Sequence, residues 1–158
     1  MEWVHRMGTN PSTRKQEQVM VYSYENYVEG IDSLTKQINR SKKPDYICGI
    51  HRGGLIPAVH LSYKLKVPLI TLDRRALYQV SREDYEILTD PQKSVIIVDE
   101  IIDSGETVGI VNRFFERDFQ WACLVYNTSQ DFCKDPYYHT AIDRTLTNEY
   151  VIFHWEND

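Results

Sequence analysis

The stretch Ser94–Ile110, SVIIVDEIIDSGETVGI, constrains the fold of this chain more than any other. It begins with a run of β-branched apolar residues, which predicts a buried strand. Two adjacent acids, Asp99 and Glu100, follow this run, and a small polar loop with a glycine then leads into a helical pattern. Carboxylates at a strand end, followed by such a loop and a helix N-terminus, are typical of a site for a phosphorylated ligand in an α/β protein.

Strands and helices alternate along the rest of the chain. Apolar residues recur at helical spacing after Ser23, which we expect to be the N-cap of a helix that ends near Arg40. The alternation predicts an α/β fold with a mostly parallel sheet flanked by helices. The other expected elements are strands at Tyr46–Ile50, Val67–Leu72 and Trp121–Tyr126 and a helix at Leu55–Lys66.

A second loop with catalytic potential, His51-Arg52-Gly53-Gly54, lies between the strand at Tyr46–Ile50 and the helix that follows it. Two glycines let the backbone approach a ligand closely, and Arg52 adds a cation. The same residues would also suit a plain tight turn with a solvated arginine, so the loop alone leaves both interpretations open.

The two ends and the middle of the chain are less regular. Residues 1–19 are polar and aperiodic, and we expect a loose, partly disordered extension before a single domain at residues 20–158. The polar segment Arg74–Pro91 suits either a lid over the site or a surface excursion with a hairpin, with a short strand at Tyr85–Leu88. The aromatic tail Tyr150–Glu156 suits either a last core strand or a platform that stacks on a planar heterocycle.

Composition limits the classes of function. The chain has 158 residues and a formal net charge of −5, which argues against broad nucleic-acid binding. Three cysteines with no CxxC pair argue against a zinc site or a disulfide framework, and we expect Cys48 and Cys123 to be buried. Because no apolar run could span a membrane and no signal peptide is visible, we expect a cytoplasmic protein without membrane partners.

The acids of the central stretch limit the kinds of phosphorylated ligand that the site could bind. Asp99 and Glu100 point to different sides of the strand and could accept hydrogen bonds from the vicinal hydroxyls of a sugar or hold Mg²⁺. Asp103 begins a loop whose amides can converge on a phosphate, and the hydroxyls of Ser104 and Thr107 add donors. The site therefore suits a ribose 5′-phosphate. No P-loop, GxGxxG, HExxH or GxSxG motif is present in the sequence.

VIIVDEIIDSGETV resembles the phosphoribosyl-diphosphate (PRPP) signature of type I phosphoribosyltransferases, and IHRGGLIPA resembles the pyrophosphate loop of that family. The ending YVIFHWE is similar to the base-binding segment of the xanthine-guanine branch. The resemblance runs from about Met20 to the end of the chain. It implies the type I phosphoribosyltransferase fold with a small C-terminal base-binding hood, and an Mg²⁺-dependent transfer of the phosphoribosyl group from PRPP to a nucleobase.

The resemblance also implies roles for individual residues. Arg52, Gly53 and Gly54 would bind pyrophosphate, with a strained peptide after Arg52, and Arg82 would reach the pyrophosphate from the lid. Asp99 and Glu100 would face the ribose hydroxyls and Mg²⁺, and Asp103 would sit beside the reacting base nitrogen. The loop that wraps the 5′-phosphate would consist of Ser104, Gly105, Glu106 and Thr107. The residues expected to bind the base are Thr128, Tyr150 as the stacking ring, Val151 through its backbone, and Glu156.

The chain departs from the branch at three places, one beside the expected 5′-phosphate and two at the expected base site. Glu106 replaces a glycine, Tyr150 replaces a tryptophan, and residues 126–128 lack the lysine that reads a purine 6-oxo group. The leading interpretation is transfer to a 6-oxopurine (xanthine, guanine or hypoxanthine) in nucleotide salvage. The alternatives are the same reaction on another base, a PRPP-sensing regulator that binds nucleic acid, and an inactive nucleotide-binding subunit. From the relatives we expect a homodimer or homotetramer.

Overall fold

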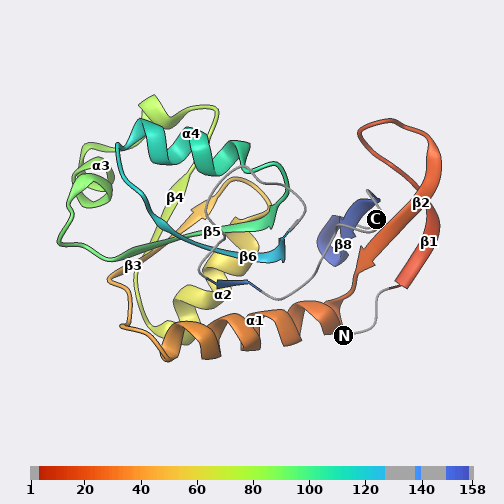
Figure 1. Ribbon diagram of the computed structural model, residues 1–158, viewed down its shortest axis with the longest axis horizontal. Helices are drawn as coiled ribbons and strands as arrows, with labels where there is room; N and C mark the ends of the chain where they lie inside the picture. The colour runs from red at the N-terminus through yellow and green to blue at the C-terminus, as the bar shows by residue number, and fades with distance from the viewer. Residues whose placement is uncertain (1–3, 127–137, 140–148, 157–158) are drawn as a thin grey trace.

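A computed structural model describes residues 4–126, 138–139 and 149–156 (Figure 1). Its main sheet has five strands in the order β4-β3-β5-β6-β7, and every neighbouring pair is parallel. This confirms the predicted α/β fold with a mostly parallel sheet flanked by helices. The strands are β3 (Tyr46–Ile50), β4 (Leu69–Leu72), β5 (Val95–Ile102), β6 (Gln120–Tyr126) and β7 (Tyr138–His139).

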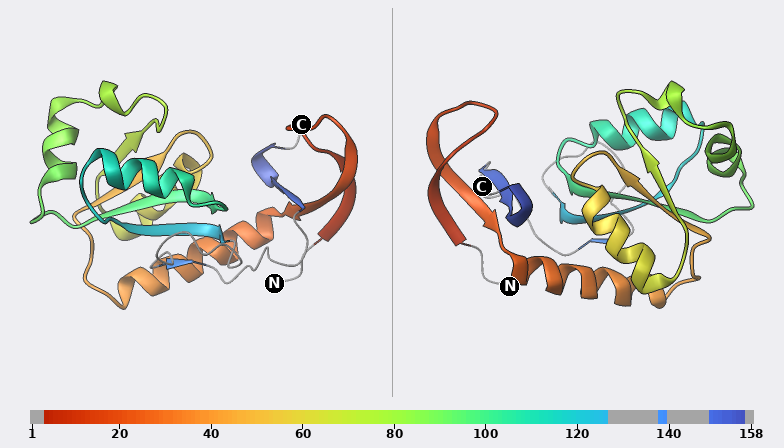
Figure 2. Two further views of the ribbon diagram at one scale, coloured as in Figure 1. Left: turned by 45° about the horizontal axis from the view of Figure 1, so that its top comes forward. Right: turned by 180° about the vertical axis from the view of Figure 1, so that it is seen from behind.

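Helices cover both faces of this sheet (Figures 1 and 2). Side chains alternate along a strand, so β5 sends Ile96 and Val98 into one core cluster and Val95 and Ile97 into the other. Burial on both faces explains why the strand appears in the sequence as a continuous apolar run. One cluster includes residues of α1 (Tyr24–Asn39) and α2 (Leu55–Leu65), and the other includes residues of η1 (Leu77–Gln79), α3 (Arg82–Thr89) and α4 (Glu106–Phe114).

Helix α1 starts where the sequence predicts. The Ser23 hydroxyl accepts a hydrogen bond from the backbone N–H of Asn26 at 3.1 Å, which satisfies one of the free amides of the first turn. The helix ends at Asn39, and Arg40 is its C-cap. Both predicted ends are therefore confirmed.

The expectation of a loose extension at residues 1–19 is wrong for its described part. Strands β1 (Val4–Thr9) and β2 (Gln16–Tyr22) form an antiparallel hairpin, and β2 pairs in parallel with β8 (Tyr150–Phe153). Most residues of β1 are exposed, so backbone pairing rather than an apolar pattern defines this strand. For this reason hydrophobic periodicity gave no signal here.

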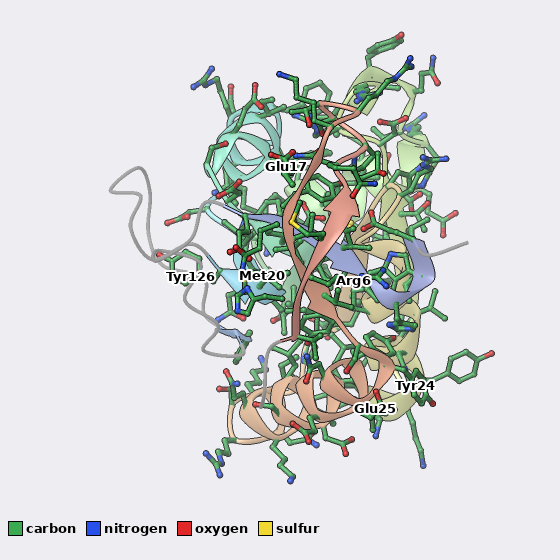
Figure 3. The ribbon with its side chains drawn as sticks, turned by 90° about the vertical axis from the view of Figure 1, so that its right-hand side faces the viewer. Arg6, Glu17, Met20, Tyr24, Glu25 and Tyr126 are labelled. Atoms are coloured by element: carbon green, nitrogen blue, oxygen red, sulfur yellow. The ribbon has the colours of Figure 1, made fainter. Side chains whose placement is uncertain are left out.

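The hairpin, β8 and the short 3₁₀ turn η2 (His154–Glu156) together form a second, smaller layer, which we call the hood. The hood lies beside the main sheet in Figure 1, and Figure 3 looks onto its hairpin, with Arg6 on β1 and Glu17 and Met20 on β2. The predicted hood is therefore present, but it is built from both ends of the chain rather than from the C-terminal end alone.

The segment Arg74–Pro91 also differs from expectation. Residues Tyr85–Leu88 are helical, within α3, and not a short strand. The Ser81 hydroxyl caps this helix by accepting the backbone N–H three residues on, at 3.0 Å. Leu77 and Leu88 are buried in the core, so the segment is anchored against the sheet at two points, and it consists of η1 and α3 rather than a hairpin.

Two further expectations concern cysteines and membranes. Cys48 and Cys123 are free and buried, as predicted, and burial raises the pKa of both thiols; Cys133 lies outside the described residues. Within the described residues, no helix combines the length and the apolar character needed to cross a bilayer.

Candidate active site

The candidate site lies at the carboxyl edge of the main sheet. Parallel strands β3, β4 and β5 end at the same edge, so the loops that follow them come together there. These loops carry Arg52, Arg74 and Asp103, which are far apart in the sequence. Two of the cavities that open at this edge are lined by residues of the central stretch.

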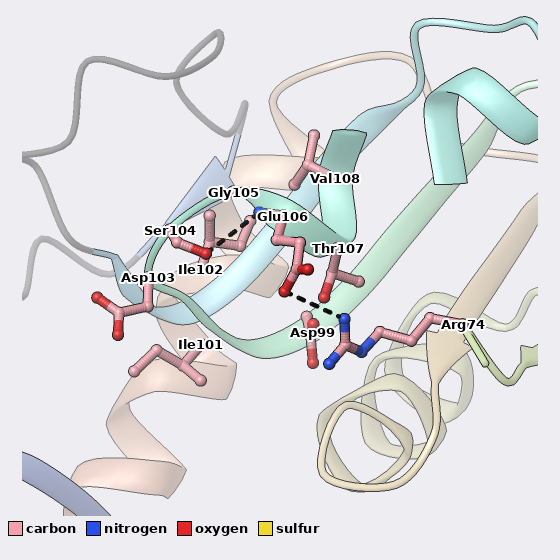
Figure 4. Close-up of a pocket in the computed structure, with 10 residues that line it drawn as sticks. All are labelled: Arg74, Asp99, Ile101, Ile102, Asp103, Ser104, Gly105, Glu106, Thr107 and Val108. Carbon is pink, nitrogen blue, oxygen red and sulfur yellow. Dashed lines mark hydrogen bonds and ion pairs between the residues drawn. The ribbon is translucent and has the colours of Figure 1, made fainter. Parts of the chain in front are cut away.

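The first cavity, which we call the loop cavity, has a volume of about 180 Å³ (Figure 4). The end of β5 and the first turn of α4 provide most of its wall, and Arg74 closes it from the end of β4. The structure thus brings together most of the residues expected from the central stretch. The lining residues are Arg74, Asp99, Ile101, Ile102, Asp103, Ser104, Gly105, Glu106, Thr107 and Val108.

The N-terminus of α4 gives the loop cavity its electrostatic character. Gly105 is the N-cap and has φ 74°, a left-handed conformation that explains why a glycine stands there. The Ser104 hydroxyl accepts the Glu106 N–H at 3.4 Å, and the partial positive charge of the helix end faces the cavity. Backbone amides and a dipole of this sign suit a phosphate group.

Arg74 is the cation of the loop cavity, and sequence analysis did not assign it a role. Its Nη1 lies 3.5 Å from Glu106 Oε2 across the cavity. Arg82, the expected arginine, instead sits on α3 with its side chain 92% exposed and paired with Glu86 at 2.8 Å. The position of Arg74 in the sequence could have identified it, because Arg74 follows the end of a predicted parallel strand, where ligands bind in this kind of sheet. Arg82 does not follow a strand.

The glycine loop packs directly against β5. A Cβ at Gly54 would lie 2.6 Å from the Val98 carbonyl oxygen, and one at Gly53 would collide with the Glu100 carboxylate. At Gly54 the obstacles are backbone atoms, so only glycine permits the approach there; at Gly53 the obstacle is the end of the Glu100 side chain. The cis peptide bond of the loop lies between His51 and Arg52, before the arginine rather than after it, and the exposed Arg52 lines neither of the two cavities.

The two adjacent acids, which the sequence predicts to point to different sides of the strand, line different cavities. Asp99 lines the loop cavity, and Glu100 lines the second one. Burial, and then the neighbouring Glu100 carboxyl, raise the pKa of Asp99 well above its ordinary value. Glu100 Oε2 is buried and has no hydrogen-bond partner among the described residues. An acceptor left in this state is suited to a ligand hydroxyl or a cation.

The second cavity, which we call the hood cavity, has a volume of about 320 Å³ and lies between β5 and the hood. Three of the four expected base-binding residues line it, namely Tyr150, Val151 and Glu156. Thr128 lies outside the described residues. The complete lining is Ser12, Glu100, Ile101, Asp103, Tyr150, Val151, Phe153 and Glu156.

Glu156 is held in place and partly desolvated. Its Oε2 accepts the Phe153 N–H at 3.0 Å. Burial raises the pKa of this carboxyl; the Phe153 hydrogen bond lowers it, and the nearby Glu100 charge raises it again. Among the described residues, the charged side chains that line the hood cavity are all acids, so the cavity favours a partner that offers N–H donors.

The loop cavity and the hood cavity adjoin. Ile101 and Asp103 line both of them. Figure 4 shows the Asp103 side chain directed away from Arg74 and Asp99. A group bound in one cavity would therefore meet a group bound in the other next to the Asp103 carboxylate.

The acids of the site also bear on metal binding. No three His, Cys, Asp or Glu side chains of the described residues are grouped so that they could hold a metal ion by themselves. Mg²⁺, however, is commonly bound by one or two carboxylates with water and substrate oxygens. Asp99 and the unpartnered Glu100 Oε2 fit this kind of shared site.

Several known proteins with similar sequences or structures are phosphoribosyltransferases. A xanthine-guanine phosphoribosyltransferase of Cereibacter sphaeroides is 25% identical over 118 residues, which cover 70% of this chain and 68% of the relative. An adenine phosphoribosyltransferase of Prochlorococcus marinus is 25% identical over 91 residues, with coverage of 49% and 53%. The crystal structure of a purine phosphoribosyltransferase from Pyrococcus horikoshii has a TM-score of 0.66 and 27% identity, and covers 87% of this chain and 93% of its own.

The phosphoribosyl transferase domain family matches residues 18–118, which is more than half of the chain. The match includes both the glycine loop and the central strand–loop–helix. The chain therefore belongs to the phosphoribosyltransferase domain family.

Proposed function

We propose that this protein transfers the 5-phosphoribosyl group of PRPP to a 6-oxopurine (xanthine, guanine or hypoxanthine) and releases pyrophosphate. The observation that carries the proposal is that two cavities of different character meet at Asp103. The loop cavity suits the sugar phosphate, and the hood cavity suits the base. The bond between the base and C1 of the ribose would then form at their junction.

The phosphate end of PRPP would lie in the loop cavity. Backbone amides at residues 104–107 and the Thr107 hydroxyl would hold the 5′-phosphate, helped by the α4 dipole. Arg74 would lend positive charge from the opposite wall. The pyrophosphate would lie at the glycine loop, where Gly53 and Gly54 bring the backbone close to β5 and Arg52 is exposed to receive it.

Asp99 and Glu100 would accept hydrogen bonds from the ribose hydroxyls and hold Mg²⁺ together with the oxygens of PRPP. Bound there, Mg²⁺ would neutralise charge that builds on the departing pyrophosphate. A cation would also stabilise the ionised form of Asp99, whose burial opposes ionisation in the ligand-free chain.

The chemistry replaces one bond at C1 with another. The bond from C1 to the pyrophosphate oxygen breaks, and a bond from C1 to a base nitrogen forms. Positive charge develops on the sugar during this exchange, and the Asp103 carboxylate would stabilise that charge or receive the proton that the base nitrogen releases. Arg52 would help to stabilise the leaving group.

Three observations support a purine as the acceptor. The hood cavity presents the ring of Tyr150 for stacking and the backbone of Val151 for the base edge. Its acids, including Glu156, suit the N–H groups of a base such as guanine. The xanthine-guanine relative spans more of this chain than the adenine relative does, which favours a 6-oxopurine.

The test is a panel of nucleobases with PRPP and Mg²⁺, scored by pyrophosphate release, with Asp103→Asn as the inactive control. We expect turnover with at least one of xanthine, guanine and hypoxanthine, at a higher kcat/KM than with adenine. Turnover with adenine or a pyrimidine alone would refute the proposed base. Tight PRPP binding without turnover of any base would refute the enzyme and favour a PRPP-sensing regulator. Cytoplasmic location and a homodimeric or homotetrameric state remain predictions.

A further inference from the structure

The N-terminal hairpin lies largely outside the residues that match the family, yet it contributes to the wall of the hood cavity. The match begins at residue 18, so β1 and the tip of the hairpin lie outside it. Ser12, at this tip, nevertheless lines the hood cavity together with Glu100, Asp103 and Tyr150. Residues from the two ends of the chain thus face the same space.

The tip that carries Ser12 is a well-defined turn. The buried Asn10 side chain accepts the Ser12 N–H at 2.9 Å. The Asn10 backbone N–H donates to the Lys15 carbonyl at 2.9 Å, and the Arg14 N–H donates to the Asn10 carbonyl at 2.7 Å. These bonds fix the conformation of the turn and therefore the position of Ser12 within it.

The hairpin is tied to the strand that carries the expected stacking residue. In the parallel pairing of β2 with β8, Val19 lies opposite Tyr150 and Met20 lies opposite Val151. At the other edge of the hairpin, His5 Nδ1 lies 2.6 Å from Glu149 Oε2. Ser12 therefore lies in the turn between two strands of the sheet that also contains Tyr150, and the pairing of β2 with β8 holds the hairpin beside Tyr150.

The chemistry of Ser12 complements the rest of the cavity. Glu100, Asp103 and Glu156 can only accept hydrogen bonds when ionised, whereas a nucleobase also presents acceptor atoms of its own. The Ser12 side chain is exposed, and its hydroxyl makes no hydrogen bond to another described residue. A hydroxyl can donate to such an acceptor, and residues 126–128 contain no lysine to do so.

We propose that Ser12 is a specificity-determining residue of the base site: the hairpin tip forms the outer wall of the hood cavity, and the Ser12 hydroxyl donates a hydrogen bond to an acceptor atom of the bound base. This inference rests on the proposed function, because it assigns a contact to the same site. It also gives the N-terminal hairpin a role in binding the base.

The experiment compares Ser12→Ala and Ser12→Phe with the wild type, using the base that the wild type turns over best. We expect Ser12→Ala to raise the KM for the base about fivefold, with the KM for PRPP within twofold of the wild type. Ser12→Phe fills the cavity and should raise the KM for the base more than about tenfold. Thermal unfolding of each variant checks that the fold is kept.

Thr13→Ala is the matched control. Thr13 is the next residue of the same turn, and its hydroxyl donates to Glu17 at 2.8 Å on the exposed side of the hairpin. We expect this variant to keep both KM values. Ser12→Phe with an unchanged KM for the base, or equal effects of Ser12→Ala and Thr13→Ala, would overturn the inference while leaving the proposed function intact. Absence of turnover by the wild type with every base would overturn both.

Discussion

The loop cavity and the hood cavity share a border but are built in opposite ways. Apart from Arg74, the residues that line the loop cavity all lie between positions 99 and 108 of the chain. The hood cavity combines Ser12 from the N-terminal hairpin, acids from β5 and residues 150–156. The first depends on local chain geometry, and the second depends on the pairing of strands that are more than a hundred residues apart.

This difference matches a difference in chemistry. Binding of a phosphate needs backbone amides at a helix N-terminus, a requirement that a short motif can carry. Recognition of a base needs side chains placed around a planar ring, and any part of the chain can supply them. Within one family we therefore expect the loop cavity to vary little in what it binds and the hood cavity to vary more.

Substitution of Asp103 at the junction should have the largest effect. Asp103→Asn keeps the size of the side chain and removes its charge, so both cavities should still bind their ligands while the reaction fails. We expect kcat to fall about 10²- to 10⁴-fold, with the Kd for PRPP within threefold of the wild type. Single-turnover kinetics and equilibrium binding measure the two quantities. Wild-type turnover in this variant would remove Asp103 from the reaction.

Tyr150 should separate the two cavities. Loss of the ring in Tyr150→Ala removes stacking, and we expect the KM for the base to rise about 10- to 100-fold. The KM for PRPP should stay within twofold, because Tyr150 does not line the loop cavity. Tyr150→Phe retains the ring and is the control, with kinetics near those of the wild type. Equal losses for both substrates in Tyr150→Ala would contradict the division between the cavities.

The same division explains which parts of the molecule could be predicted from the sequence. The parallel sheet, the Ser23 cap and the loop at residues 103–107 follow from local patterns. The hairpin could not be predicted, because β1 is exposed and depends on pairing for its definition. Arg74 was missed for a related reason: its role comes from the alignment of β4 beside β3, which no local motif encodes.

Asp99, which lines the loop cavity, should also affect the free energy of unfolding of the protein. Its raised pKa means that the folded chain holds the proton more tightly than the unfolded chain does. This favourable contribution is complete below the unfolded pKa and is lost as the pH rises through the folded pKa. At neutral pH, ionisation of Asp99 therefore opposes folding of the ligand-free protein, and Asp99→Asn should stabilise it by about 1–3 kcal/mol.

Chemical denaturation at pH 4 and pH 7 tests this expectation, and the gain should be confined to pH 7. Asp32→Asn is the control: its carboxyl is about half exposed and has a pKa lowered by the hydrogen bond from Lys64, so its removal should bring no gain at either pH. The same Asp99→Asn variant should lose affinity for PRPP with Mg²⁺. A variant that is neither more stable nor weaker in PRPP binding would place Asp99 outside the site.

The smallest effect is expected at Glu106, the acid that stands near the proposed 5′-phosphate. Its pair with Arg74 is 3.5 Å long and its side chain is 68% exposed, so the pair adds little to stability. Glu106→Gln removes a negative charge beside the phosphate and releases Arg74 to face it. We expect the KM for PRPP to fall about two- to threefold, and less at high salt.

Glu86→Gln provides the matched control, because Glu86 pairs with Arg82 on the exposed face of α3 at 2.8 Å. If Arg74 rather than Arg82 serves the phosphates, this second substitution should leave the KM for PRPP unchanged. An increase in that KM in Glu106→Gln would mean that the acid holds Arg74 in position and does not compete for it. A decrease in Glu86→Gln would instead return the role to Arg82, so the two variants together decide which arginine completes the loop cavity.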